Sequence, residues 1–193
     1  NQTIKIIEEN CGLEVDQDSK NNIELFFEER LRVQFINNGY SHDVFSAANS
    51  LATTTIADLE VRLKATEEFK QSQHSKTLIE ANKRSFNIIA KSDLSENPFD
   101  LSVNKALFQS KFETNLNTEI EKIQSDFDLL VKAKRYAEGY QLLATLAEPV
   151  DQYFENVMVN DENVDVRKNR LVQLAQFCGL TKLIADLSKL VKS

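Results

Sequence analysis

Oxygen-bearing side chains at alternate positions, Asp161, Asn163 and Asp165, could begin a calcium-binding loop. Such a loop needs oxygen ligands at its first, third and fifth positions, a glycine at the sixth and a glutamate at the twelfth. Counted from Asp161, the sixth position is Val166 and the twelfth is Val172, so the sharp turn and the two-oxygen ligand are both missing. We therefore predict no metal site here. We interpret the acids as a polar turn before a helix, whose N-terminus favours negative charge.

The dipeptide His42-Asp43 is typical of a class of metal-dependent phosphohydrolases. The chain has no histidine before His42 and only His74 after it, so the ligand set of such an enzyme cannot be assembled. We expect the dipeptide to lie in the first turn of a helix that Ser41 caps. A Gly-x-Ser-x-Gly turn, a phosphate-binding glycine loop and a cysteine cluster for zinc are also missing from the sequence. The sequence predicts no catalytic residue and no metal site.

Basic and amide side chains are the remaining candidates for a binding site. Arginine stacks on unpaired bases and grips phosphate with two parallel hydrogen bonds, while asparagine can read base edges. The commoner role of a helical lysine or arginine is to keep an outer face soluble, and that interpretation stays open for each residue. As a set they could instead line a groove for an RNA loop, and the candidates are Arg30, Arg32, Arg62, Lys83, Arg84, Asn87, Arg167, Lys168, Asn169 and Arg170.

The charge of the chain is acidic overall but unevenly distributed. The net charge of −7 and the pI near 5.0 argue against a general nucleic-acid binder, which is normally basic. Residues 148–165 carry six acids and no base, whereas residues 166–193 carry six bases and one acid. Residues 76–92 contain four bases against one acid. A local binding site is therefore compatible with an acidic chain.

The elements that would position these residues are predicted to be helices. Four glycines and two prolines leave little turn chemistry, and no segment shows the alternation of a strand. We expect an all-α helical bundle, with a remnant of a preceding region or a linker at 1–20 and the helical domain at 21–193. The apolar repeats predict helices from 22 to about 37, from 41 to about 50, from Thr55, around 78–89, two or three between 103 and 147, one opening at Pro149 and one from about 164 that keeps Leu183, Leu187 and Leu190 inward.

Two local patterns make the helix predictions specific. The first helix has one apolar stripe and a glycine-type stop at Gly39, and the stripe consists of Ile23, Phe26, Phe27, Leu31 and Phe35. Thr55 and Asp58 have the spacing of a capping box, with aspartate in place of glutamate.

The cysteines and the chain ends bear on the setting of the protein. Cys11 and Cys178 lack the spacing of a redox or metal motif, so a reduced cytoplasmic setting suits them better, although a single bridge stays open. There is no apolar run of membrane-spanning length and no secretory signal. The chain starts at Asn1 and its only methionine is Met158, so we interpret it as part of a larger protein.

The segment 146–177 resembles the C-terminal end of the beta subunit of bacterial glycyl-tRNA synthetase. The shared motifs are Pro149-Val150-Asp151, Tyr153-Phe154, Val157-Met158-Val159, the acidic turn 161–165 and Arg167-Lys168-Asn169-Arg170-Leu171. Three earlier stretches match the same family in order: FFEERLRVQFINNGYSHDVFSAA, DLEVRLKATEEF and ANKRSFNIIAKS. Together they cover roughly residues 20 to 190. The chain departs from the family at Asn160, where an apolar residue is common, and at 177–179.

The resemblance implies an anticodon-binding helical domain of the DALR type, similar to that of arginyl-tRNA synthetase, although the Asp-Ala-Leu-Arg tetrad does not occur here. It implies tRNA(Gly), the synthetase alpha subunit and the remainder of the beta subunit as partners, and the cytoplasm as the location. In that family the alpha subunit binds ATP, Mg²⁺ and glycine, so we expect no cofactor in this chain. The alternative is a structural helical module that docks other parts of the synthetase without touching RNA.

A base preference follows from the implied partner. Glycine codons begin with two guanines, so glycine anticodons end in two cytosines. The exocyclic amine of cytosine is a donor that aspartate or glutamate can accept from. Because an acidic segment directly precedes a basic one at Val166, we expect a mixed site of acids, arginine and asparagine.

Overall fold

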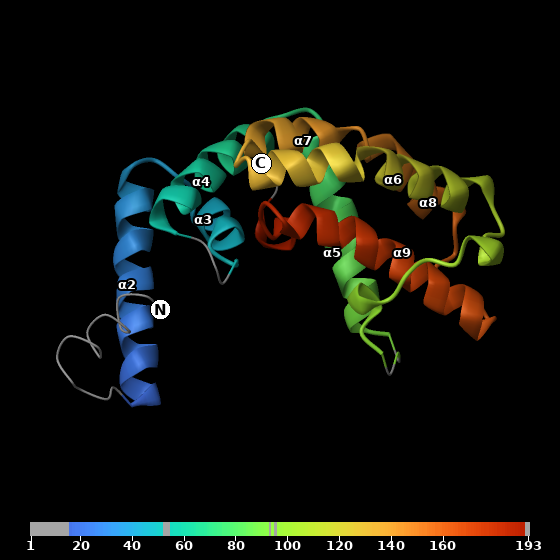
Figure 1. Cartoon of the computed structure of the whole chain (residues 1–193), viewed down its shortest axis with the longest axis horizontal. Helices are drawn as coiled ribbons and strands as arrows, with labels where there is room; N and C mark the ends of the chain where they lie inside the picture. Colours follow the sequence, from blue (N-terminus) through green and yellow to red (C-terminus); the bar gives the residue numbers. More distant parts are fainter. Residues whose placement is uncertain (1–15, 52–54, 93, 95, 192–193) are drawn as a thin grey trace. The chain divides into compact units, whose positions relative to one another are not determined.

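The computed structural model describes residues 16–51, 55–92, 94 and 96–191, and within these ranges the chain forms helices and no strand (Figure 1). The prediction of an all-α fold is confirmed. The chain divides into two compact units, Asn1–His42 and Asp43–Ser193. The helices are α2 (Gln17–Asn37), α3 (His42–Ala48), α4 (Ile56–Lys70), α5 (Ser75–Ala90), α6 (Lys111–Lys132), α7 (Tyr136–Ala144), α8 (Ala147–Asn156) and α9 (Val164–Lys182), with short 3-10 turns η1 (Pro98–Asp100), η2 (Lys105–Leu107) and η3 (Leu187–Lys189).

Helix α2 forms the described part of the first unit. It begins at Gln17 because the Asp16 carboxylate accepts a hydrogen bond from the Ser19 backbone N–H at 2.8 Å. The expected start at residue 22 was therefore too late, since the polar segment that looked like a link supplies the cap and the first turn. The helix ends before Gly39, whose φ of +98° is open to glycine and strained for other residues. The glycine-type stop is confirmed.

The apolar stripe predicted for α2 is only partly buried. Phe35 is 4% exposed, but Phe26 and Phe27 are 56% and 49% exposed. Their rings meet edge to face, with centroids 5.9 Å apart. Phe26 and Phe27 thus belong to the predicted stripe but remain exposed. Helical spacing shows which residues share a face, but it does not show what that face packs against.

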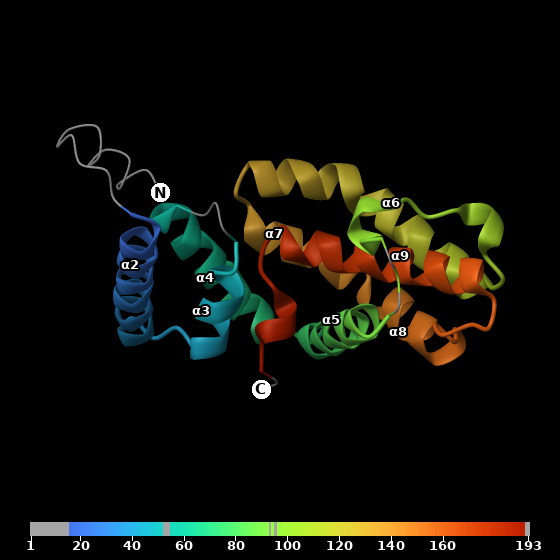
Figure 2. The same cartoon turned by 90° about the horizontal axis from the view of Figure 1, so that it is seen from below.

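Helix α9 is the central element of the second unit. It packs against α5, α6 and the η1 and η2 turns, while α7 packs against α4 and α6, and α8 against α5 and α6. Figure 2 shows α9 running between α5 and α6. Most of α9 is buried, including Leu171, Leu174 and Phe177. Polar residues of α9, among them Asn169, Arg170 and Gln173, are buried together with its apolar ones, so the core of the unit is built on this helix.

Helix α7 approaches the end of the chain closely at Gly139. A Cβ added there would lie 2.9 Å from Cδ1 of Ile184 and 3.4 Å from the Phe127 ring. Contacts this short force a neighbour to move, so glycine permits the close packing of α7 against the residues that follow α9.

Two predicted helix ends differ from the observed ones. Helix α9 begins at Val164 as expected but ends at Lys182. Leu187 and Leu190 are buried, but they belong to a 3-10 turn and to the chain after it, and Leu183 is 42% exposed. Helix α8 begins at Ala147, which makes Pro149 its third residue and not its first. Proline is tolerated throughout the first turn because its missing N–H would have no partner within the helix.

The chain after α9 is fastened to α3. The Asp186 backbone N–H donates to the Ala47 carbonyl at 3.0 Å, and the Val191 N–H donates to the Asp43 carboxylate at 2.6 Å. The same carboxylate pairs with the Lys70 ammonium at 2.8 Å. These contacts close the second unit by joining its first helix to its last residues.

In the part of the chain that the structure describes, every helix is too short or too polar to cross a membrane.

Candidate nucleic-acid interface

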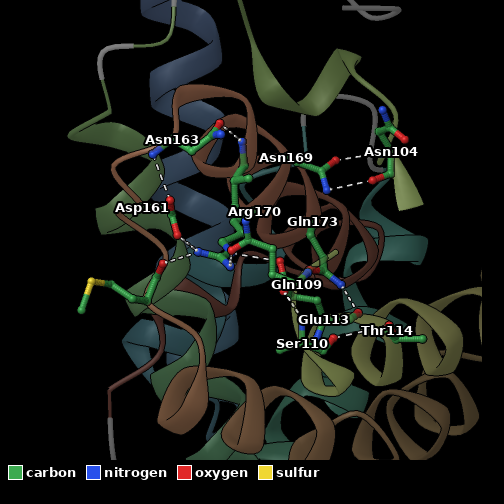
Figure 3. A network of polar contacts seen from close by, with 12 residues as sticks. Asn104, Gln109, Ser110, Glu113, Thr114, Asp161, Asn163, Asn169, Arg170 and Gln173 are labelled. Atoms are coloured by element: carbon green, nitrogen blue, oxygen red, sulfur yellow. Dashed lines mark hydrogen bonds and ion pairs between the residues drawn. The ribbon is translucent and has the colours of Figure 1, made fainter. Parts of the chain in front are cut away.

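Arg170 lies in the core of the second unit, held by acceptors from three segments (Figure 3). Its Nε donates to Glu113 Oε1 at 2.9 Å, and Nη1 donates to Asp161 Oδ2 at 2.7 Å and to the Met158 carbonyl at 2.9 Å. Its Nη2 donates to Gln109 Oε1 at 3.1 Å. Arg170 is 5% exposed and Glu113 is fully buried. Arg170, one of the candidates for an RNA groove, is therefore a buried residue whose guanidinium is held by acceptors of the protein.

Both carboxylate oxygens of Glu113, the partner of Arg170, accept hydrogen bonds. Its Oε2 accepts the backbone N–H groups of Gln109 and Ser110, each at 2.9 Å, and this completes a capping box at the start of α6. The Glu113 carbonyl also accepts from the Gln173 side chain at 2.6 Å. A buried carboxylate is stable only when its oxygens have hydrogen-bond donors and a counter-charge, and Glu113 has both.

The acidic turn 161–165 forms the start of α9, which confirms the structural interpretation of this segment. The Asn163 side chain caps the helix by accepting from the backbone N–H groups of Asp165 and Val166. The Asp161 carboxylate accepts from the Asn163 N–H at 2.9 Å, and Arg167 donates to the Asp161 carbonyl at 2.9 Å. No group of three histidine, cysteine or acidic side chains placed to hold a metal ion occurs within the described ranges.

Asn169 serves as a clip between α9 and the segment before α6. Its Oδ1 accepts from the Asn104 backbone N–H at 2.7 Å, and its Nδ2 donates to the Asn104 carbonyl at 3.1 Å. The side chain is buried, and Figure 3 shows it facing Asn104. Because both ends of the amide are bound to Asn104, Asn169, a candidate for reading a base edge, has a structural role here.

Arg62 is the second buried arginine of the unit. Its Nε pairs with Asp58 Oδ2 at 2.7 Å, and its Nη1 donates to the carbonyls of Leu183 and Ile184, each at 2.7 Å. Its guanidinium lies 4.2 Å from the centroid of the Tyr136 ring. Arg62 on α4 therefore binds the two carbonyls just beyond the end of α9, and its expected place on an outer face was wrong.

Asp58 explains why only half of the predicted capping box formed at Thr55. Thr55 caps α4 by accepting from the Asp58 N–H at 3.2 Å. The Asp58 carboxylate accepts from Arg62 and from the Tyr136 hydroxyl, the latter at 2.7 Å. Burial by itself raises the pKa of this carboxyl, but the hydrogen bonds from Arg62 and Tyr136 outweigh burial and hold the pKa below its usual value.

Acid is expected to destabilise the second unit through Asp58 and Asp161. The Asn163 N–H and the Arg170 guanidinium likewise hold the pKa of Asp161 below its usual value. A carboxyl whose pKa is lower in the folded chain stabilises the fold above its unfolded pKa of about 3.9, and this contribution is lost as the pH falls through the folded value. Urea unfolding between about pH 6 and about pH 2 should show a declining free energy of unfolding.

The variant Asp161→Asn isolates one part of this acid effect. It lacks the titrating carboxyl, so its free energy of unfolding should decline less steeply with acid than that of the unaltered chain. Equal declines in both proteins would show that Asp161 makes no contribution to the pH dependence.

The remaining candidates keep side chains at the surface, on two different units. Lys83 is half-buried on α5, whereas Arg84 and Asn87 are exposed there, and the Arg84 guanidinium lies 4.4 Å from the centroid of the Phe154 ring. On α2, Arg32 pairs with Glu29 at 2.6 Å and Arg30 lies 5.2 Å from the Phe26 ring centroid. On α9, the Lys168 ammonium pairs with Glu96, and Arg167 is half-buried.

A cationic aromatic cluster beside α5 was missed in the sequence. The Lys182 ammonium lies 4.2 Å from the centroid of the Phe86 ring and 5.2 Å from that of Phe99. The two rings stack with centroids 6.1 Å apart and an interplanar angle of 26°. The three residues belong to α5, η1 and α9, so no local spacing in the sequence connects them.

The described cysteine carries no reactive thiol. Cys178 is fully buried in α9, and burial raises the pKa of its thiol to about 12. Cys11, the other half of the bridge left open by the sequence, lies outside the described residues.

Comparison with known proteins gives one family and a consistent set of relatives. The family described as the DALR anticodon binding domain matches residues 78–186. The chain is similar to the glycine–tRNA ligase beta subunit of Pseudomonas fluorescens, 35% identical over 165 residues, which cover 86% of this chain and 24% of that protein. It is also similar to the subunit of the same name from Klebsiella pneumoniae, 40% identical over 162 residues, which cover 83% and 23%. The chain thus spans about a quarter of the length of these relatives.

Proposed function

Since this chain belongs to the family of DALR anticodon-binding domains, we propose that its second unit recognises the anticodon loop of a transfer RNA. We place the RNA on the outer face of α5. Its basic and amide side chains stay at the surface, whereas Arg62, Asn169 and Arg170 are committed to the core. The family match includes most of α5.

The face of α5 has the composition that a single-stranded loop requires. Residues three and four apart share one side of a helix, so Lys83, Arg84, Asn87 and Lys91 form one stripe. Lysine and arginine attract phosphate, the guanidinium plane offers a stacking surface, and asparagine offers a donor and an acceptor for a base edge. The Phe154 ring under Arg84 supports that guanidinium from one side.

The base preference that we propose is for the two cytosines of a glycine anticodon. The similar proteins are named as beta subunits of glycine–tRNA ligase, and this name motivates the choice of tRNA(Gly). Of the acids around the start of α9, Asp161 is engaged by Arg170, whereas Glu162 and Asp165 are exposed. Exposed carboxylates are suitable acceptors for the exocyclic amine of cytosine.

The wider setting that we propose is that of a synthetase with two kinds of subunit. This chain would supply tRNA binding within a beta subunit, and an alpha subunit would bind ATP, Mg²⁺ and glycine. The assembly would work in the cytoplasm, where tRNA is charged. No cofactor is assigned to this chain.

Replacing the two cytosines in an anticodon stem-loop RNA is expected to weaken binding by about 1–3 kcal/mol for each base that is read. The reason is that a wrong base leaves a carboxylate facing another acceptor. Fluorescence anisotropy with labelled hairpins, identical except at those two positions, measures the difference. Equal affinity for both hairpins would rule out base reading by this chain.

The salt dependence of the same titration separates RNA recognition from structural docking. Each phosphate contacted in single-stranded RNA contributes a slope of about −0.7 to the plot of log affinity against log salt. The double variant Lys83→Gln with Arg84→Gln should bind more weakly and with a shallower slope. Lys122→Gln with Lys132→Gln, two lysines on α6, is the matched control of equal charge. Identical slopes for both variants would contradict the placement of RNA on α5.

A further inference from the structure

We propose that Phe99, supported by Phe86 and Lys182, is a stacking platform for one unpaired base of the bound RNA loop. This inference rests on the proposed function and names a contact residue that neither the family match nor the sequence motifs single out. The observation behind it is the geometry of three side chains from three elements. The stacked rings of Phe86 and Phe99 share one ammonium group, that of Lys182, within 5.2 Å of both centroids.

The platform is fixed in place by the η1 turn. Asn97 caps this turn by accepting from the Phe99 N–H at 3.3 Å, and its side chain donates to Asp100 at 2.9 Å. Pro98 is buried, and η1 packs against α9. A ring on a turn held in this way loses little freedom when a base stacks on it, which favours binding.

Phe99 also remains accessible. It is 37% exposed, although it stacks on Phe86 and lies near Lys182. An aromatic side chain normally buries itself if its surroundings allow, and Phe45, Phe127 and Phe177 of the same unit do so completely. Phe99 is instead held at the surface by the turn that carries it.

The charge around the platform favours a nucleotide over an apolar partner. Lys182 brings a positive charge directly to the rings, and Lys83 lies one helical turn before Phe86 on α5. Asn87 follows Phe86 and is exposed on the proposed RNA face. Aromatic rings flanked by cations and an amide are the combination that binds unpaired bases by stacking, phosphate attraction and edge hydrogen bonds.

Phe99→Ala is the test variant and Phe112→Ala is its matched control. Phe112 on α6 is also a partly exposed ring with a lysine beside it, since the Lys111 ammonium lies 5.1 Å from its centroid. Loss of one base–aromatic stack by alanine substitution corresponds to roughly a 5- to 140-fold loss of affinity. We expect a loss in this range for Phe99→Ala with the anticodon stem-loop, and an unchanged affinity for Phe112→Ala. The salt slope should stay the same in both, because stacking contacts no phosphate.

A hairpin with an abasic loop separates stacking from indirect effects. The backbone of this RNA offers the same phosphates but no base to stack. The unaltered chain and Phe99→Ala should therefore bind it equally. Unequal binding, or equal binding of both proteins to the normal hairpin, overturns the platform while leaving the proposed function in place. Failure of the unaltered chain to bind any of the hairpins overturns the proposed function itself.

Phe99→Trp provides a second readout that keeps an aromatic ring at the site. The chain has no tryptophan, so this variant carries a single indole whose fluorescence reports on the platform. Stacking of a base on the indole should quench its fluorescence during titration with the normal hairpin, and the abasic hairpin should leave it unchanged. Circular dichroism of all variants checks that the helices are retained. An unquenched indole in a saturated complex contradicts the proposal.

Discussion

Replacing Arg170 by methionine is expected to lower the free energy of unfolding by about 3–5 kcal/mol. Methionine retains much of the side-chain volume. It cannot donate the hydrogen bonds that the Arg170 guanidinium gives to Glu113 at 2.9 Å and to Asp161 at 2.7 Å. Glu113 is fully buried and would be left as an uncompensated charge. The Met158 carbonyl would lose its donor as well, so the loop before α9 would be held less firmly. Urea unfolding followed by circular dichroism measures the change.

Lys168→Met is the control for Arg170→Met. Lys168 lies two positions away on the same helix and also pairs with an acid, Glu96, but that pair is at the surface. Surface ion pairs contribute about 0–1 kcal/mol, so the control should unfold nearly as the unaltered chain does. Similar losses in the two variants would refute the assignment of Arg170 to the core. If RNA affinity instead falls with Arg170→Met at unchanged stability, Arg170 belongs to the RNA site.

Arg62→Met is expected to have an effect of the same size, about 3–5 kcal/mol. The substitution leaves the buried Asp58 carboxylate without its guanidinium partner, and it removes the donor from the carbonyls of Leu183 and Ile184. These carbonyls lie just beyond α9, where no helical N–H is left to satisfy them. Thermal and urea unfolding both measure the loss, and Lys64→Met, on the exposed side of the same helix, is the control.

The same experiment tests whether α4 folds with the helices that the family match covers. Arg62 belongs to α4, which precedes residue 78, whereas its acceptors lie at the end of α9. One cooperative transition, shifted to lower urea in Arg62→Met, is expected because the arginine connects the two. A transition of α4 separate from that of α9 in the unaltered chain would contradict a single folding unit from residue 43 onward.

The helical class and most helix positions could be predicted from the sequence, because they depend on residues that are close together in the chain. The start of α9 at Val164 was predicted because acids cluster before it, as they do at the N-terminus of a helix, and Asn163 is the residue that caps it. The end of α9 was missed because Leu183, Leu187 and Leu190 continue the apolar spacing while the backbone leaves the helix. Arg62, from another helix, makes this ending favourable by binding the carbonyls of Leu183 and Ile184 just after it. A contact between residues so distant in the sequence has no local signal.

For the candidate site, too, the sequence indicated what depends on neighbouring residues and not what depends on tertiary contacts. Sequence motifs singled out basic and amide residues as candidates, but they could not separate arginines that hold the core from arginines at the surface. The stretch Arg167–Arg170 contains both kinds, with Lys168 paired at the surface and Arg170 buried. The cluster of Phe86, Phe99 and Lys182 was missed altogether in the sequence. None of the three residues stands out in the sequence, and only the fold brings them together.

The hydrogen bond between the Val191 N–H and the Asp43 carboxylate, 2.6 Å long, brings residues 43 and 191 of the second unit together. A unit whose ends adjoin behaves as a cassette, because it can be inserted into a loop of a host fold without stretching either side. Residues 43 and 191 are thus the natural junctions for moving this unit between proteins or for joining its ends and reopening it elsewhere. A cut at residue 78, where the family match begins, would separate α9 from Arg62, which holds the carbonyls just beyond its end.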